Sequence, residues 1–360
     1  MYEMSPRERA IATLEFRKPD RIPKGASFTP HIMEEFRRHT GADDPAEYYG
    51  FEDRHVHLAA TRVEYDFSRY YPKGLPVGTE VNEWGEANVP GDFYHFTTYL
   101  QPLASVNTVD DLKAFPWPDV KADYRYAHLD DTVKSLRQAG YFVIGNAGHT
   151  GWEKACYMRG IDNISCDLID NQDFAEYLLD LFCDFHSFMA RRYAEAGVDM
   201  VWLSEDMGMQ DRLFMSPEMY RRWVKPRTKK VIDAAREVNP GIFIAQHHCG
   251  KVDALIRDFI EIGTNALNPI QPECMDVLDI KRRFGDVLTL WGTVGAQSVF
   301  PFGTPEGIRQ TVRDNIRNLG YNGGFWIGPS QTLEPEVPWE NIEAFFDAVE
   351  EFGRYPAGGR

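Results

Sequence analysis

The chain has 360 residues and a formal net charge of −16, and this acidity excludes a typical nucleic-acid-binding protein, which binds phosphates through basic patches. With 43% hydrophobic and 26% charged residues it has the composition of a globular protein, and its apolar runs are shorter than the ~20 residues of a membrane-spanning helix. The polar N-terminus and the odd number of cysteines, five, favour a cytoplasmic protein without a disulfide framework.

The first expected elements are a short helix, a strand and a second helix. Ser5 precedes Pro6 and apolar residues at helical spacing, which is the pattern of a capped helix start. A strand is expected near residues 24–28 and a helix over residues 31–38. Residues 51–120 are less regular, with turn residues and alternating segments that are typical of β-hairpins, and we interpret them as an insertion in the N-terminal third.

From residue 124 onward the pattern repeats as a helix, a short apolar run and a polar strand exit. The runs are nearly continuously apolar, as parallel strands buried on both faces should be. They cover residues 141–144, 199–203, 241–245, 266–267, 287–290 and 324–327. With the strand near residues 24–28 and one more expected within residues 51–120, they predict an α/β fold, a (β/α)₈ TIM barrel that forms a single domain over residues 1–360. An open doubly wound sheet is the alternative, although no glycine-rich dinucleotide motif follows any strand.

Polar and aromatic residues after the predicted strands should meet at the mouth of the barrel, where catalytic groups collect. They are Asn146, His149, Glu205, Asp206, His247, Cys249, Asn268, Cys274, Trp291 and Gln331. Among them, we expect Asn146, Asn268, Trp291 and Gln331 to contact a substrate.

The segment His247-His248-Cys249 follows the apolar run of residues 241–245 directly. Imidazole and thiolate are ligands that Zn²⁺ prefers. If the backbone is still extended there, His247 and Cys249 point to one side and His248 to the other. The segment therefore offers His247 and Cys249 as a metal pair, and the alternative of a packed histidine with a small buried cysteine stays open.

The pair Glu205-Asp206 also follows a strand, so one carboxylate should face the mouth and either bind a metal or move a proton. The alternative is that one of them caps the next turn and the other faces solvent. His149 is a candidate acid/base or substrate-binding group, with a packing role as the alternative. Cys274 is a possible substitute ligand, unless it is a buried spectator.

Taken together, these motifs resemble the uroporphyrinogen decarboxylase superfamily, whose members fold as (β/α)₈ barrels. The resemblance runs from residue 7 to about residue 352. It rests on residues 9–14 with 19–23, 204–208 with 215–220, 247–250, 268–269, and 323–325 through 337–342.

The superfamily contains porphyrinogen decarboxylases and cobalamin-linked methyltransferases. The decarboxylases resemble one another in an arginine-rich segment after the first strand and a histidine near the last strand, where this chain has Ser27-Phe28-Thr29-Pro30-His31 and Gln331. The methyltransferases carry a zinc-binding His-x-Cys at the position of His247 and Cys249, and often another cysteine where this chain has Ser330-Gln331.

The resemblance therefore implies a zinc shell of His247, Cys249 and an oxygen ligand such as Glu205, with Cys274 as a substitute. In it Glu205, Asp206 and His149 are the catalytic candidates.

Our leading hypothesis is a zinc-dependent methyltransferase that moves a methyl group between a small substrate, such as a methoxylated aromatic undergoing O-demethylation, and a corrinoid protein. The corrinoid is expected from that partner, because the chain has no Asp-x-His-x-x-Gly motif. The alternatives are a decarboxylase of a porphyrinogen-like or smaller carboxylate, and a non-catalytic barrel that binds a small molecule.

Overall fold

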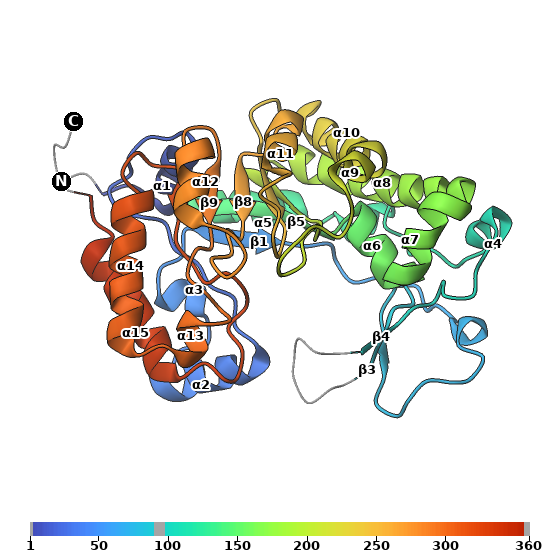
Figure 1. Ribbon diagram of the computed structural model, residues 1–360, viewed down its shortest axis with the longest axis horizontal. Helices are drawn as coiled ribbons and strands as arrows, with labels where there is room; N and C mark the ends of the chain where they lie inside the picture. The colour runs from blue at the N-terminus through green and yellow to red at the C-terminus, as the bar shows by residue number, and fades with distance from the viewer. Residues whose placement is uncertain (1–2, 90–97, 356–360) are drawn as a thin grey trace.

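Seven parallel strands form the central sheet of this computed structural model, which describes residues 3–89 and 98–355 (Figure 1). In spatial order they are β1 (Asp53–Val56), β5 (Phe142–His149), β6 (Met200–Ser204), β7 (Phe243–His247), β8 (Ala266–Asn268), β9 (Thr289–Trp291) and β10 (Phe325–Trp326). The register pairs Ser204 with His247 and His247 with Asn268. Three polar strand ends therefore lie side by side at one edge of the sheet.

The segment 24–28 lies beside β10, where Lys24 and Phe28 form isolated parallel bridges with Ile327 and Leu333. On its other side, the Lys24 N–H donates to the Glu52 carboxylate immediately before β1, at 2.9 Å. The segment therefore occupies the place of an eighth strand, which confirms the TIM-barrel-like α/β fold. It forms these isolated bridges rather than a regular strand, and residues 329–332, between the two bridged positions, line the cavity at the mouth. The strand expected within residues 51–120 is β1.

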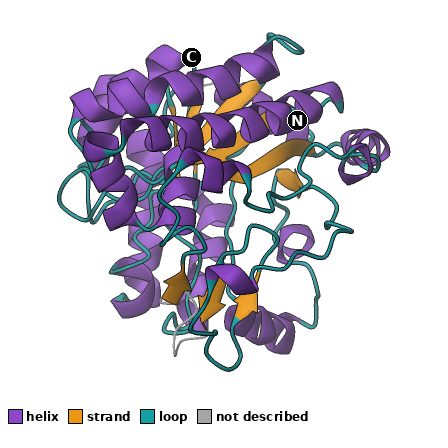
Figure 2. Ribbon diagram, turned by 90° about the vertical axis from the view of Figure 1, so that its right-hand side faces the viewer, coloured by secondary structure: helices purple, strands orange, loops and turns teal. Residues whose placement is uncertain are grey.

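Helices enclose the parallel strands (Figure 2). They are α1 (Pro6–Leu14), α2 (Pro30–Thr40), α3 (Pro45–Tyr48), α4 (Val109–Lys113), α5 (Leu129–Gln138), α6 (Gly151–Arg159), α7 (Ile161–Asp170), α8 (Gln172–Glu195), α9 (Pro217–Trp223), α10 (Lys225–Arg236), α11 (Ile256–Ile262), α12 (Val277–Phe284), α13 (Val299–Phe302), α14 (Pro305–Leu319) and α15 (Trp339–Phe352). The predicted start of α1 is confirmed, since Ser5 and Glu8 form a reciprocal capping box. None of the described helices combines the length and the apolar character that crossing a membrane requires.

The N-terminal insertion contains a small antiparallel sheet of β2 (Glu80–Val81), β3 (Ala87–Val89) and β4 (Thr98–Leu100), as the hairpin pattern predicts. The part of that pattern in residues 90–97 lies outside the described residues. Trp84 of the insertion packs edge-on against Phe182 and Phe185 of α8, with ring centroids 6.1 and 5.7 Å apart. The insertion is thereby attached to the outer helices of the barrel.

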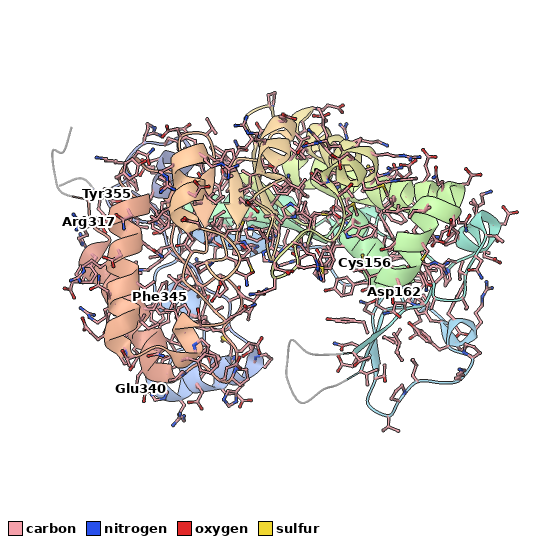
Figure 3. The ribbon with its side chains drawn as sticks, in the orientation of Figure 1. Cys156, Asp162, Arg317, Glu340, Phe345 and Tyr355 are labelled. Carbon is pink, nitrogen blue, oxygen red and sulfur yellow. The ribbon has the colours of Figure 1, made fainter. Side chains whose placement is uncertain are left out.

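Side chains fill the interior of the barrel below its mouth. Trp291 and Trp326 stack there with ring centroids 4.2 Å apart, and Ala10 and Leu14 of α1 pack into the same cluster from the end opposite the strand exits. Figure 3 places Phe345 of α15 at one end of the molecule and Cys156 of α6 towards the other. A filled interior leaves the C-terminal mouth of the strands as the place for chemistry.

Candidate functional site

Three ligand-type side chains meet at the end of β7. The His247 Nε2 atom lies 3.2 Å from the Cys249 Sγ atom and 3.8 Å from the Asp206 Oδ1 atom. The three ligand atoms all lie within 4.8 Å of one another, so a single ion can reach all of them. His248 points the other way, as the extended backbone predicts, and stacks on Phe259 with ring centroids 4.2 Å apart.

Burial, followed by the charge of His247, lowers the pKa of His248 to about 3, so its ring is neutral at physiological pH. With its Nε2 atom 2.8 Å from the Gln246 Oε1 atom, it is a packing residue.

Two amides orient the ligands. The Nδ1 atom of His247 lies 2.7 Å from the Asn268 Oδ1 atom, and a proton assigned to Nδ1 by this contact leaves the Nε2 lone pair facing Cys249 and Asp206. The Gln331 Nε2 group donates to the Cys249 Sγ atom at 3.2 Å. Asn268 and Gln331, expected to contact a substrate, thus also hold the ligand side chains.

The electrostatics of this cluster favour a cation. Burial raises the pKa of the Cys249 thiol, and the neighbouring carboxylates of Asp206 and Glu153 raise it further. Burial and the charge of Glu153 also raise the pKa of Asp206. A divalent cation would stabilise both groups in their deprotonated forms. One nitrogen, one sulfur and one oxygen ligand, partly buried, are a donor set that fits zinc.

Glu205 faces a different way from Asp206. Its side chain is 1% exposed, and its two carboxylate oxygens accept from the Thr150 hydroxyl at 2.9 Å and from the Glu153 N–H at 3.0 Å. Burial raises the pKa of Glu205 to about 8. Successive residues of an extended chain face opposite sides, and it is Asp206, not Glu205, whose carboxylate lies with His247 and Cys249. Glu205 instead caps the first turn of α6.

His149 is joined to the ligand cluster through Glu153, a residue of α6 that sequence reasoning missed. The His149 Nδ1 atom lies 2.9 Å from one Glu153 oxygen, and the other accepts the backbone N–H of Asp206 at 3.2 Å. Burial alone would raise the pKa of Glu153, but the hydrogen bond and charge of His149 outweigh it and hold this pKa below its usual value. The sequence signal was the four-residue spacing from His149.

The mouth contains a cavity of about 560 Å³ next to His247. All four expected substrate contacts, Asn146, Asn268, Trp291 and Gln331, line it. The Trp202 ring also lines it, nearly perpendicular to Trp291 with ring centroids 5.3 Å apart. A volume of this size suits a small molecule.

Two candidates lie away from this cavity. His149 lines a separate cavity of about 520 Å³, beside Tyr157 and Lys154. Cys274 is buried, and burial together with Glu273 raises the pKa of its thiol to about 11. Among the described residues, the group of three ligand atoms includes neither side chain.

A second row of polar side chains faces the cavity from β1. Asp53, His55 and His57 line it, and the Asp53 Oδ2 atom lies 3.2 Å from the His55 Nε2 atom. Sequence reasoning missed these residues, although their every-second-residue spacing is that of one face of a strand. They fall in the region that was interpreted as an irregular insertion.

Comparisons with known proteins agree with this architecture. The model of a family described as uroporphyrinogen decarboxylase (URO-D) matches residues 99–352. The methylcobamide:CoM methyltransferase MtaA of Methanosarcina barkeri is 26% identical over 205 residues, which cover 54% of this chain and 57% of that protein. A uroporphyrinogen decarboxylase of Pseudomonas syringae pv. tomato is 25% identical over 257 residues, which cover 69% of this chain and 70% of that protein.

The chain spans about half the length of the curated methyltransferases it matches, 57% and 51% of two Methanosarcina barkeri proteins. Among solved structures, a methyltransferase from Methanosarcina mazei is similar with a TM-score of 0.65 at 19% identity, covering 97% of this chain and 99% of that one. At this identity the likeness shows the fold.

Proposed function

We propose that this chain, which belongs to the uroporphyrinogen decarboxylase family, is a zinc-dependent methyltransferase that moves a methyl group between a small substrate and a corrinoid protein. The observation that carries the proposal is the meeting of Asp206, His247 and Cys249 ligand atoms within 4.8 Å of one another. Similarity to a curated methylcobamide:CoM methyltransferase supports this reaction class.

In this proposal His247 Nε2, Cys249 Sγ and a carboxylate oxygen of Asp206 hold the zinc ion. When bound, zinc would supply a Lewis acid for the atom that carries the methyl group. Asn268 keeps the His247 ring in the tautomer that presents Nε2, and Gln331 donates to the Cys249 sulfur.

The aromatic side chains of the mouth support a substrate with a planar ring, such as a methoxylated aromatic. Trp202 lines the cavity next to the ligand cluster, with its ring centroid 6.0 Å from that of His247. Aromatic rings prefer such offset or edge-on contacts with one another. Trp202 and Trp291 would therefore hold the ring while Asn146 offers a polar contact.

Glu205 and His149 take part through α6. Glu205 accepts the Glu153 N–H and so holds the start of the helix, and Glu153 in turn accepts the Asp206 N–H. His149 pairs with Glu153 through its Nδ1 atom, 2.9 Å from the carboxylate. We propose that these residues position Asp206, and that a partner protein brings the corrinoid.

Metal analysis of the purified protein tests the proposed site. We expect about one zinc per chain in the wild type and its loss in Asp206→Ala, His247→Ala and Cys249→Ala, because each removes a ligand. Cys274→Ala is the matched control and should keep the metal. Stoichiometric zinc in all three ligand variants would contradict the proposal.

Decarboxylation of a carboxylate substrate is the second candidate function, because uroporphyrinogen decarboxylases align with 69% of the chain. Release of CO₂ in the presence of a chelator and without corrinoid protein would favour it. Methylation of cob(I)alamin would favour the methyltransferase, and the change in the absorbance of the corrinoid measures this reaction. For a non-catalytic barrel we expect neither reaction, and we expect the ligand-type side chains to point apart. The His247 Nε2 and Cys249 Sγ atoms instead lie 3.2 Å from each other.

A further inference from the structure

The β1 side of the cavity carries a carboxylate–imidazole pair that has no part in the proposed reaction. The Asp53 side chain is 12% exposed, and its Oδ2 atom lies 3.2 Å from the Nε2 atom of His55, whose side chain is 31% exposed. The other Asp53 oxygen, Oδ1, is buried and has no hydrogen-bond partner among the described residues. His55 is therefore the polar neighbour of this carboxylate among the described residues.

The Asp53 carboxylate favours one of the two tautomers of the His55 ring. The Asp53 Oδ2 atom lies 3.2 Å from the His55 Nε2 atom, and a carboxylate oxygen next to a ring nitrogen favours the tautomer that carries its proton on that nitrogen. In the neutral ring the Nδ1 atom is then a hydrogen-bond acceptor. No described residue donates to this Nδ1 atom, and His55 lines the cavity. The pair thus offers an acceptor to a bound molecule.

Trp202 relates this acceptor to the ligand cluster. Its ring centroid is 5.9 Å from that of His55 and 6.0 Å from that of His247. A substrate ring that packs on Trp202 would have one substituent near the ligand cluster and another near His55. The two ends of such a substrate are then recognised by different chemistry.

We propose that His55, oriented by Asp53, is a specificity-determining residue that accepts a hydrogen bond from an O–H group of the substrate. The substrate would then be an aromatic methyl ether that also carries a hydroxyl group, either on the ring or on a short side chain, because His55 needs an O–H donor. This inference rests on the proposed function for the place of the substrate. A site that accepts a hydrogen bond from a hydroxyl group binds the analogue without it less well, because the acceptor loses its partner.

Calorimetric titration of the full-length protein with matched ligands tests the inference. The first pair is 4-methoxyphenol and 4-methylanisole, which differ by a hydroxyl in place of a methyl group. The second pair, 4-methoxybenzyl alcohol and 4-ethylanisole, places the hydroxyl on a side chain. In the wild type we expect about tenfold tighter binding of the hydroxylated member of one pair, the size of one neutral hydrogen bond. The pair that shows this preference tells whether the recognised hydroxyl group is on the ring, as in a phenol, or on a side chain, as in an alcohol.

His55→Phe keeps a ring of similar shape and removes the acceptor, so the preference should fall to about one. His31→Phe, an exposed position on α2 outside the cavity, is the matched control and should retain it. Equal binding within both pairs in the wild type, or a preference that survives in His55→Phe, overturns the inference. The titration uses neither corrinoid nor methyl transfer, so its failure is distinct from loss of the proposed function, which the zinc content reports.

Discussion

Asn268 controls the chemistry of His247 without being a ligand itself. Its Oδ1 atom lies 2.7 Å from the His247 Nδ1 atom, and this contact assigns the ring proton to Nδ1. Only then does the Nε2 lone pair face the Cys249 sulfur, 3.2 Å away. A neighbour of this kind fixes the tautomer and orientation of a metal-binding histidine and raises its basicity.

If zinc binds as proposed, Asn268→Ala should weaken its binding about 10–100-fold, because the His247 ring loses the partner that fixes its tautomer. Competition with a chromogenic chelator measures this affinity. Asn268→Asp keeps an acceptor at the same place and should restore most of it, and Asn163→Ala on α7 is the remote control. An unchanged zinc affinity in Asn268→Ala would show that the ring is held by other contacts.

The sequence was sufficient to predict the direction of some side chains of the site and not of others, and the reasons are local. The alternation of an extended chain gave the common direction of His247 and Cys249. It could not tell which of Glu205 and Asp206 continues towards the mouth, since that depends on the backbone after β6. Glu153 was missed because a helical residue reaches the site only through the orientation of its whole helix.

At the scale of elements, two carboxylates connect the end of β6 to the start of α6, one from each element. Glu205, after the strand, accepts the Thr150 hydroxyl and the Glu153 N–H at the start of the helix. Glu153, in the helix, accepts the Asp206 N–H after the strand. A carboxylate at a helix N-terminus also interacts favourably with the helix dipole. This exchange sets where Asp206 stands, which no periodicity in the sequence reveals.

Helices α9, α10 and α11 are joined through one buried carboxylate. The Asp258 oxygens accept from the Arg221 guanidinium at 2.9 Å and from the Lys225 ammonium at 2.8 Å, and its side chain is 4% exposed. Burial would raise the pKa of Asp258, but these hydrogen bonds and charges hold it below the usual value. A depressed folded-state pKa stabilises the fold above the unfolded pKa, and this contribution is lost as the pH falls through the folded pKa.

Asp258→Asn should therefore lower the free energy of unfolding at pH 7 by about 1.5–3 kcal/mol, the range for hydrogen bonds to charged groups. The difference from the wild type should shrink as the pH falls below about 4, where the wild-type carboxyl group becomes protonated. Urea unfolding at several pH values measures both. Asp253→Asn, which removes a partly exposed partner of Lys251, is the control and should change stability by less than about 1 kcal/mol. A difference that stays constant with pH would contradict the assignment.

At the scale of the whole molecule, the repeated βα pattern and the expected strand near residues 24–28 predicted the barrel, but the contacts that close it could not be predicted. The strands from β5 to β10 are apolar runs that a sequence reveals. β1 carries Asp53 and His55 on the face that lines a polar cavity, and Arg54 between them pairs with Glu47, so this strand lacks the apolar pattern. The segment 24–28 closes the barrel through bridges on one side and a side-chain contact on the other, which only the folded chain brings together.

Glu52 is the centre of this closure. Its side chain is fully buried, and its oxygens contact Arg9 at 3.1 Å, Arg21 at 3.0 Å and the Lys24 N–H at 2.9 Å. These contacts join α1, the closing segment and the start of β1, and the Lys24 ammonium continues to Glu350 of α15. Elements from both ends of the chain thus depend on one carboxylate.

Removal of this carboxylate should destabilise the barrel as a unit. Glu52→Ala leaves the buried Arg9 and the partly buried Arg21 without a central partner, and breaking a buried ion pair from one side costs about 3–5 kcal/mol. Tryptophan fluorescence during urea unfolding measures the loss as a lower midpoint. Glu15→Ala removes a carboxylate from an exposed pair with Arg17 and should stay within about 0.5 kcal/mol of the wild type. If both variants unfold at the wild-type midpoint, the closure is held by the backbone bridges alone, and Glu52 only fills space between them.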